Sequence, residues 1–269
     1  MRLAFLGAGR MASAMVSGLL ERRYCRPEEI VVSSRSRKRL IEFTERLGVR
    51  VAGSNQEAVE GADAVMVCVK PGDVGKALAE CGGRASGRLV ISVAAGVLIG
   101  DLVRLGAGER VIRAMPNVAA SVGRSVTAMA CSDSATAEDE RMGVEIFEAV
   151  GRVVVVKEDL MEALTGLCGS GPAFVCLFVE ALSDGAVAAG VRRDLAVELA
   201  MEMVAGSAEW MMAGGRHPAE LREEVASPGG TTIAGLLHLE GKAVRAAIAG
   251  AVMEAARRAR ELSSGGGSG

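Results

Sequence analysis

The sequence predicts an α/β domain with a parallel sheet, followed by an all-helical domain. Up to about residue 156, short runs rich in Val, Ile and Ala alternate with helix-like segments, which is the pattern of β-α-β units. From residue 157 onward these runs disappear, and Met, Ala, Leu and Glu recur at helical spacing. The 269 residues suffice for two domains, which we assign to residues 1–156 and 157–262.

Eight short runs are expected to form the strands of the first domain. They are residues 2–6, 29–33, 49–51, 62–69, 88–94, 110–115, 126–131 and 152–156. Residues 64–69 read Ala-Val-Met-Val-Cys-Val with no polar alternation, so helices should cover both faces of this strand. We therefore expect it in the middle of the sheet.

Six segments of the second domain show helical spacing. They are residues 162–167, 172–189, 195–212, 219–225, 233–239 and 243–262. Residues 173–182 carry one charged residue, Glu180, and are more apolar than a helix with a single buried stripe. This excess predicts burial in an obligate dimer. The Gly- and Ser-rich residues 263–269 are expected to be a flexible tail.

Composition and charge exclude several classes of function. The 31 basic and 33 acidic residues nearly cancel, so we expect no nucleic-acid partner. The six cysteines form no C-x-x-C pair and lie mostly in apolar runs, which indicates buried thiols, a reducing cytoplasmic setting and no metal site. Arg10 interrupts the apolar run at the N-terminus, and residues 89–100 are shorter than the roughly 18 that span a bilayer. We expect no membrane segment.

A glycine-rich turn lies between the first predicted strand and an apolar-periodic helix. It reads Gly7, Ala8, Gly9, Arg10, Met11, Ala12, a G-x-G-x-x-A pattern. Gly7 permits the tight turn, Gly9 lets the backbone approach a pyrophosphate, and Ala12 allows close helix packing. The helix N-terminus then faces the anion. We interpret the turn as a dinucleotide site in a Rossmann-type domain; the alternative is a glycine turn without a ligand.

The end of the second predicted strand favours NADPH as the cofactor, with NADH possible. An NAD site normally has Asp or Glu there, whereas this sequence has Ser34 and Arg35. Hydroxyl groups and a guanidinium would bind a 2′-phosphate that a carboxylate would repel. The alternative is that Ser34 caps the next helix and that Arg35, Arg37 and Lys38 form its solvated face.

Two further segments follow strands at the edge where a ligand crevice is expected. They are Val69, Lys70 and Pro71 after the fourth strand, and Ala94, Ala95 and Gly96 after the fifth. We expect both to flank the nicotinamide half of the cofactor. For Lys70, a solvated cation in a loop is as good an explanation as a direct role in the site. Asn117 follows the sixth strand in the same way, and its alternative is an ordinary turn residue.

The helical half has no obvious general acid or base. Its two histidines, His217 and His238, are expected to be structural, so a substrate with a protonated C=N bond would fit better than an alcohol. The turn containing Ser227, Gly230, Thr231 and Thr232 precedes a helix. Its free N–H groups and hydroxyls predict a site for a substrate carboxylate; simple N-capping is the alternative. Residues 165–173 are rich in glycine and predict a tight corner between two helices.

Taken together, these motifs resemble the pyrroline-5-carboxylate reductase family over residues 1 to about 262. The motifs are G-A-G-R-M-A, V-K-P-G, S-V-A-A-G-V, V-I-R-A-M-P-N, T-G-L-C-G-S-G-P-A-F and H-P-A-E-L-R-E-E-V-A-S-P-G-G-T-T-I-A-G-L. The resemblance implies a Rossmann-type dinucleotide-binding domain followed by an all-α helical dimerisation domain. It also implies hydride transfer from NAD(P)H to a cyclic imino acid, Δ1-pyrroline-5-carboxylate, giving L-proline.

The resemblance also implies roles for individual residues. The residues implied to contact the nucleotide are Gly7–Ala12, Ser34, Arg35, Asn55, Val69–Pro71 and Ala94–Gly96. Those implied to bind the substrate carboxylate are Ser227, Gly230, Thr231 and Thr232. The Thr232 hydroxyl matches the group that hydrogen-bonds the ring nitrogen. Homodimers with intertwined helical domains, often assembled into rings, are implied as well. This sequence departs from the family at Val118 and Ala119, where Thr-Pro is usual, and at Cys168 and Ala226.

Two other functions share part of this pattern. A β-hydroxyacid dehydrogenase has the same two-domain plan but needs a lysine in its first long interdomain helix, and residues 162–182 contain none. The second is a non-catalytic NADP-binding sensor. The turn at residues 227–232, which is expected to bind a substrate carboxylate, argues against it.

Overall fold

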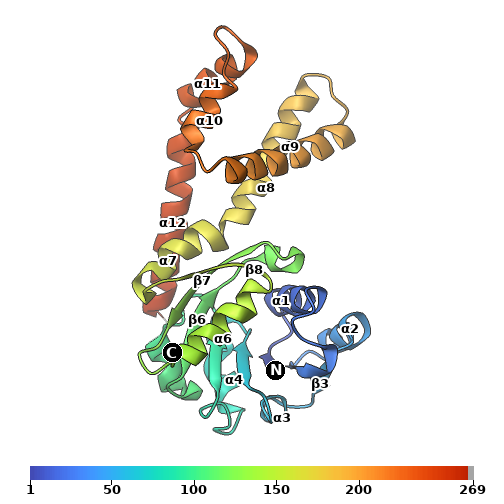
Figure 1. Ribbon diagram of the computed structural model, residues 1–269, viewed down its shortest axis with the longest axis vertical. Helices are drawn as coiled ribbons and strands as arrows, with labels where there is room; N and C mark the ends of the chain where they lie inside the picture. Colours follow the sequence, from blue (N-terminus) through green and yellow to red (C-terminus); the bar gives the residue numbers. More distant parts are fainter. Residues whose placement is uncertain (266–269) are drawn as a thin grey trace. The chain divides into compact units, whose positions relative to one another are not determined.

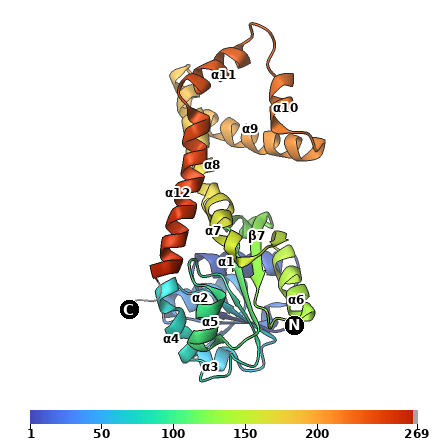
Figure 2. The ribbon, with the colours of Figure 1, turned by 90° about the vertical axis from the view of Figure 1, so that its left-hand side faces the viewer.

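The computed structural model describes residues 1–265 and divides into two compact units (Figures 1 and 2). The first unit comprises Met1–Ser170 together with the chain from Met253 onward, and the second comprises Gly171–Val252. The predicted change from α/β to all-helical sequence is confirmed, because the last strand ends at Val155.

All eight predicted strands are present in one sheet. They are β1 (Leu3–Leu6), β2 (Ile30–Ser33), β3 (Arg50–Ala52), β4 (Ala64–Val67), β5 (Leu89–Ser92), β6 (Val111–Met115), β7 (Ser125–Cys131) and β8 (Gly151–Val155), in the order β3-β2-β1-β4-β5-β6-β7-β8. The central position predicted for β4 is confirmed, since β4 pairs with β1 and β5.

Two strands depart from the predicted parallel arrangement: β7 is antiparallel to β6, and β8 runs parallel to β7. The connection from Met115 to Ser125 contains only a short 3₁₀ helix, Val118–Val122. A parallel crossover needs about a dozen residues or more, so this connection reverses the chain direction.

Helices cover both faces of the sheet (Figure 1). They are α1 (Arg10–Glu21), α2 (Arg37–Leu47), α3 (Asn55–Ala58), α4 (Val74–Ala79), α5 (Ile99–Leu102), α6 (Ala137–Glu148) and α7 (Met161–Leu164). Leu3 and Phe5 pack in a core with α1, α2 and α6, whereas Ala4 and Leu6 pack in a second core with α3, α4 and α5. This alternation fixes the register of β1.

The second unit is helical, as predicted. It contains α8 (Gly171–Ala188), α9 (Arg193–Gly214), α10 (Pro218–Glu224), α11 (Thr231–Gly241) and the first part of α12 (Val244–Gly265). The predicted connection at residues 165–173 joins two helices, α7 and α8, and contains a π-helical turn, Thr165–Gly169. Pro172 stands in the first turn of α8, where its missing N–H leaves no hydrogen bond unmade.

The flexible tail predicted from Ser263 begins too early. Helix α12 extends to Gly265, and the Ser263 hydroxyl donates to Glu162 Oε1 at 2.9 Å. The remaining residues of the predicted tail, 266–269, lie outside the described residues. Neighbouring helices therefore order a segment whose composition alone suggests a linker.

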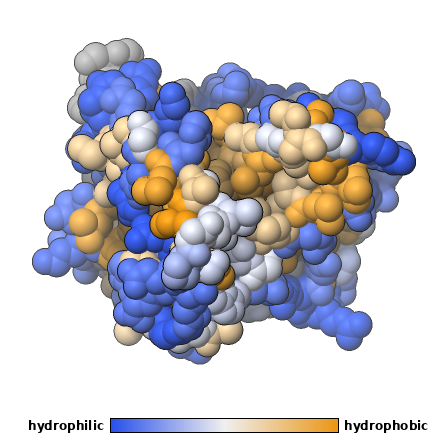
Figure 3. Space-filling view, turned by 90° about the horizontal axis from the view of Figure 1, so that it is seen from above, coloured by the Kyte–Doolittle hydropathy of each residue, from blue (hydrophilic) through white to orange (hydrophobic). Residues whose placement is uncertain are grey.

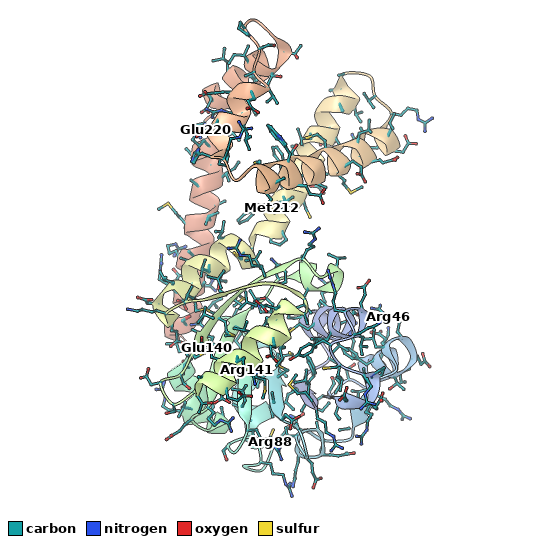
Figure 4. All side chains as sticks on the ribbon, in the orientation of Figure 1. Arg46, Arg88, Glu140, Arg141, Met212 and Glu220 are labelled. Atoms are coloured by element: carbon teal, nitrogen blue, oxygen red, sulfur yellow. The ribbon has the colours of Figure 1, made fainter. Side chains whose placement is uncertain are left out.

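Many large apolar side chains of the second unit are exposed in the single chain. Leu177 on α8 is 66% exposed, Met212 on α9 is 67% exposed and Leu237 on α11 is 67% exposed. Figure 3 shows apolar groups on the face seen from above, and Figure 4 marks Met212 and, on α10, Glu220. This pattern agrees with the apolar excess seen in the sequence. Exposed apolar surface of this kind marks a site of contact with a partner or a membrane.

One described helix, Glu158–Ala188, is long and apolar enough to span a membrane by length and composition. The expectation of no membrane segment was based on residues 89–100 and the N-terminus, and it did not consider this helix. The helix is interrupted by the π-helical turn and lies mostly unburied in the single chain. A protein partner would cover it as well as lipid would.

An ion pair between the partly exposed Arg110 and the buried carboxylate of Asp139 anchors α6 and supplies a test of stability. Arg110 Nε donates to Asp139 Oδ2 at 3.0 Å, and the Asp139 side chain is fully buried. The hydrogen bonds from Arg110 lower the pKa of Asp139 to about 2.

We expect Asp139→Asn to reduce the free energy of unfolding by about 2 kcal/mol at neutral pH. Because the folded-state pKa lies below the usual value of 3.8, the contribution is present above about pH 4 and fades as the pH falls to about 2. Denaturant titrations at several pH values measure it. A difference that stays constant down to pH 2 would contradict this account.

Candidate active site

A cavity of about 600 Å³ opens where β1, β2 and β4 end. Its position between β1 and β4 is the point at which strand order reverses, where α/β sheets bind ligands. The predicted residues Gly7, Ala8, Gly9, Ser34, Arg35, Asn55, Val69 and Lys70 line it. It therefore brings together eight of the residues predicted to hold a dinucleotide.

The backbone of the glycine turn matches the geometry that a pyrophosphate requires. Gly7 has a φ of +106°, and a Cβ there would lie 2.9 Å from the Cys68 carbonyl oxygen. Gly9 has an ordinary φ of −80°, and its nearest neighbour on the Cβ side is 3.8 Å away. No side chain caps the N-terminus of α1, so its backbone N–H groups are free to bind an anion.

The loop after β2 presents cations to this cavity. Ser36, not Ser34, caps α2, so the proposed capping role of Ser34 is wrong; Ser34 instead accepts from the Ser36 N–H at 3.2 Å. Arg35 Nη2 contacts Asp73 Oδ1 at 2.8 Å, and both side chains line the cavity. The fold thus sets a carboxylate against the guanidinium predicted to bind a 2′-phosphate.

Sequence reasoning missed several lining residues, among them Arg39, Asp73, Lys76 and Glu80. Arg39 lies two residues after the start of α2, and its position in the first turn was an available signal. Asp73, Lys76 and Glu80 lie after β4, from the short 3₁₀ helix to α4. Their approach to the β2 loop is a tertiary contact that spacing does not reveal.

Asn55 links two sides of the cavity. Its Oδ1 accepts from the Ser33 hydroxyl at 2.6 Å, and its Nδ2 donates to the Ala77 carbonyl at 3.2 Å and to Glu80 Oε2 at 2.9 Å. These bonds tie the end of β2 to α4. Asn55 therefore shapes the wall of the cavity as well as lining it.

Seven predicted cofactor residues do not line this cavity. Arg10, Met11 and Ala12 form the first turn of α1, and Ala12 packs in the core. Pro71 is exposed at the start of a 3₁₀ helix. Ala94, Ala95 and Gly96 follow β5; Gly96 has a φ of +75° and packs against Leu262 of α12.

Cys68 lies beside the glycine turn, but its thiol is inert. Burial raises the pKa of Cys68 to about 12, so the thiol stays protonated at neutral pH. Among the described residues, no group of three or more His, Cys, Asp and Glu side chains is placed to hold a metal ion.

The second predicted site lies at the start of α11, in the second unit. The Gly230 N–H donates to the Ser227 carbonyl at 3.0 Å, and a Cβ on Gly230 would collide with the Ser227 hydroxyl. Gly230 is the N-cap and supplies no side-chain cap. The first N–H groups of α11, including those of Thr231 and Thr232, therefore remain open to an anion such as a carboxylate.

Two other polar residues have structural roles. His217 caps α10 by accepting from the Ala219 N–H at 3.2 Å, which confirms its expected structural role. Asn117 caps the 3₁₀ helix at Val118–Val122 and donates to the Cys168 carbonyl at 3.1 Å. It is a turn residue, and it also ties the sheet to the π-helical turn.

Comparison with known proteins decides the family. A family model described as pyrroline-5-carboxylate reductase dimerisation matches residues 158–262, and one described as NADP oxidoreductase, coenzyme F420-dependent, matches residues 2–96. A pyrroline-5-carboxylate reductase of Arabidopsis thaliana is 40% identical over 263 residues, covering 97% of this chain and 95% of the relative. The chain belongs to the pyrroline-5-carboxylate reductase family.

Other members of the family agree in sequence and in fold. A reductase of Thermus thermophilus is 41% identical and covers 97% of this chain and 98% of its own. A crystal structure of Plasmodium falciparum pyrroline carboxylate reductase with NADP bound superposes with a TM-score of 0.90 at 28% identity, covering 98% of both chains. The resemblance drawn from the motifs is confirmed, as is the fold class.

Proposed function

We propose that this chain reduces Δ1-pyrroline-5-carboxylate to L-proline with NADPH, the last step of proline biosynthesis. The observation that carries the proposal is the match to reductases of this name at about 40% identity over nearly the whole chain. We assign the two binding functions that the reaction needs to the nucleotide cavity and to the Ser227–Thr232 turn.

The first unit fits the dinucleotide. The free N–H groups at the start of α1 would hold the pyrophosphate, and the Gly9 Cβ side leaves room for it. Ser34 and Arg35 would hold the 2′-phosphate, with Asn55, Val69 and Lys70 along the wall. Ala94, Ala95 and Gly96 would flank the nicotinamide, which supplies the hydride when bound.

The turn before α11 would hold the substrate. The N–H groups of Thr231 and Thr232 would bind the carboxylate together with the Ser227 hydroxyl, for which Gly230 leaves room because it has no Cβ. The Thr232 hydroxyl would hydrogen-bond the ring nitrogen. Hydride adds to the imine carbon, and the nitrogen, already protonated as an iminium by solvent, becomes the amine of proline. Catalysis then depends mainly on orientation, and the capping role of His217 is consistent with this assignment.

The assembly follows from the same assignment. The dimerisation match over residues 158–262 and the exposed apolar residues of α8, α9 and α11 support a homo-oligomer. We propose an intertwined homodimer of the domain 157–262, assembled further into a ring, in the cytoplasm. Light scattering with the purified protein measures the assembly.

The experiment that tests the function is a coupled assay of both substrates. The purified protein should consume NADPH when pyrroline-5-carboxylate is added and release an equal amount of proline. Binding of NADPH without consumption on any cyclic imine would instead support a non-catalytic sensor.

Arg35→Ala tests the choice of cofactor. Loss of a charge-assisted contact to the 2′-phosphate should weaken NADPH about ten- to a hundredfold and leave NADH nearly unchanged. Fluorescence titration with each nucleotide measures the dissociation constants. Equal losses for NADPH and NADH would refute the 2′-phosphate assignment.

Asp73→Asn tests the other member of the Arg35–Asp73 ion pair. Asp73 competes with the phosphate for Arg35, and exposed pairs of this kind contribute up to about 1 kcal/mol. We therefore expect NADPH to bind up to about fivefold more tightly in this variant. A weaker affinity for NADPH would show that Asp73 assists the phosphate.

A further inference from the structure

The segment proposed to flank the nicotinamide is held by residues of the helical half of the chain. A Cβ on Gly96 would lie 3.0 Å from Leu262 Cβ and 3.1 Å from the Leu262 carbonyl carbon, both in α12. Three residues further on, the Ile99 N–H donates to Glu158 Oε1 at 2.8 Å. Both ends of this short segment are therefore fixed by elements that lie far away in the sequence.

One buried arginine, Arg113, connects these two contacts. Arg113 on β6 is 1% exposed, and its Nη1 lies 3.3 Å from Glu158 Oε1 while its Nη2 lies 2.9 Å from Glu162 Oε1. Glu162 in turn accepts from the Ser263 hydroxyl at 2.9 Å. The Arg113 guanidinium therefore contacts two carboxylates. Glu158 also binds the Ile99 N–H, and Glu162 also binds Ser263 of α12.

The electrostatics favour the ionised form of Glu162. Burial alone would raise the pKa of Glu162, but the hydrogen bond and charge of Arg113, together with the Ser263 hydroxyl, hold it below the usual value. A planar fork can satisfy two carboxylates at once, which a lysine ammonium cannot do in the same geometry. Breaking either arm would leave a buried charge poorly paired.

The cluster stands where the chain enters and leaves the second unit. Glu162 lies on α7, which continues into α8 through the π-helical turn, and Ser263 lies on α12, which returns from that unit. The same arginine therefore anchors both connections of the helical unit and the segment from Gly96 to Ile99.

We propose that Glu158, Glu162 and Ser263 are positioning residues, which act through Arg113 and α12 to fix the loop that orients the nicotinamide for hydride transfer. The proposal rests on the proposed function for the identity of the loop's ligand. Misplacing reacting atoms by about 1 Å can slow a reaction about a hundredfold. Small changes in this cluster should therefore reduce turnover more than cofactor binding, since the 2′-phosphate and pyrophosphate contacts lie elsewhere.

Two mild variants test the proposal. Glu158→Gln keeps an oxygen for the Ile99 N–H but removes the charge that faces Arg113, and Ser263→Ala removes one hydroxyl. We expect kcat to fall about tenfold in the first and about threefold in the second, with the Kd of NADPH within about twofold of wild type. The deuterium isotope effect on kcat with 4-deuterated NADPH should rise, because hydride transfer becomes slower.

The controls separate positioning from stability. Glu261→Gln, next to this cluster in α12 but paired with Arg257 and Arg258 on the surface, should behave as wild type, and Ser263→Thr should restore kcat. Unchanged kcat and isotope effect in Glu158→Gln would overturn the proposal. So would a parallel loss of kcat, NADPH affinity and thermal stability, which indicates a merely structural role.

A second readout needs no imine substrate. The fluorescence of bound NADPH reports the surroundings of its nicotinamide ring, and it should change in Glu158→Gln but not in Glu261→Gln. A spectrum identical to wild type would count against the positioning role. A wild-type protein that shows no turnover with pyrroline-5-carboxylate would contradict the proposed function instead, and the fluorescence comparison would still decide this inference.

Discussion

Replacing Gly9 with alanine should leave the fold intact and weaken NADPH binding by about a hundredfold or more. The backbone of Gly9 is one that alanine adopts freely, and its Cβ would meet no atom of the protein closer than 3.8 Å. The added methyl group would instead occupy the space that the pyrophosphate needs to reach the N–H groups of α1. Losing several charge-assisted hydrogen bonds of about 1.5–3 kcal/mol each accounts for an effect of this size.

Gly7→Ala is the matched control for this prediction. Its Cβ would lie 2.9 Å from the Cys68 carbonyl, at a φ that favours glycine, so this variant should lose both thermal stability and binding. Thermal unfolding and NADPH titration on the two variants separate the effects. Normal NADPH affinity in Gly9→Ala would place the pyrophosphate elsewhere.

Thr232→Val should lower kcat by about a hundredfold without abolishing NADPH binding. Valine matches the shape of threonine but lacks the hydroxyl assigned to the ring nitrogen, and a single lost donor at a reacting centre has effects of about this size. Thr232 is half-buried in the first turn of α11, so the substitution should not unfold the helix. Steady-state kinetics with both substrates varied measures the change.

Two comparisons sharpen this result. Thr232→Ser retains the hydroxyl and should recover most of the turnover. Because the nucleotide cavity lies in the other unit, the Kd of NADPH should not change in either variant. Wild-type turnover in Thr232→Val would remove this residue from the site.

The fold could be predicted where the chain's own chemistry determines it. The unbroken apolar run of β4 required helices on both faces, and the glycine turn required the end of a strand and the start of a helix. The helical segments were found from their spacing. The reversed direction of β7 was not predicted. It is set by the connection between β6 and β7, which is too short for a parallel crossover.

The candidate site could be predicted only in part, for a physical reason. The glycine turn and the turn before α11 are local, so their residues lie next to one another in the sequence. The contact of Asp73 with Arg35 and that of Glu162 with Ser263 join residues 38 and 101 positions apart. Such contacts form only when the sheet and helices pack together, so the spacing of residues in the sequence does not predict them.

A crystal structure of this protein with NADP⁺ and L-proline tests the account most directly. We predict that the proline carboxylate lies within hydrogen-bond distance of the N–H groups of Thr231 and Thr232. The ring Cδ, which is bonded to the nitrogen and is remote from the carboxylate, should face the nicotinamide. Proline bound at another place, with no contact to this turn, would contradict the account.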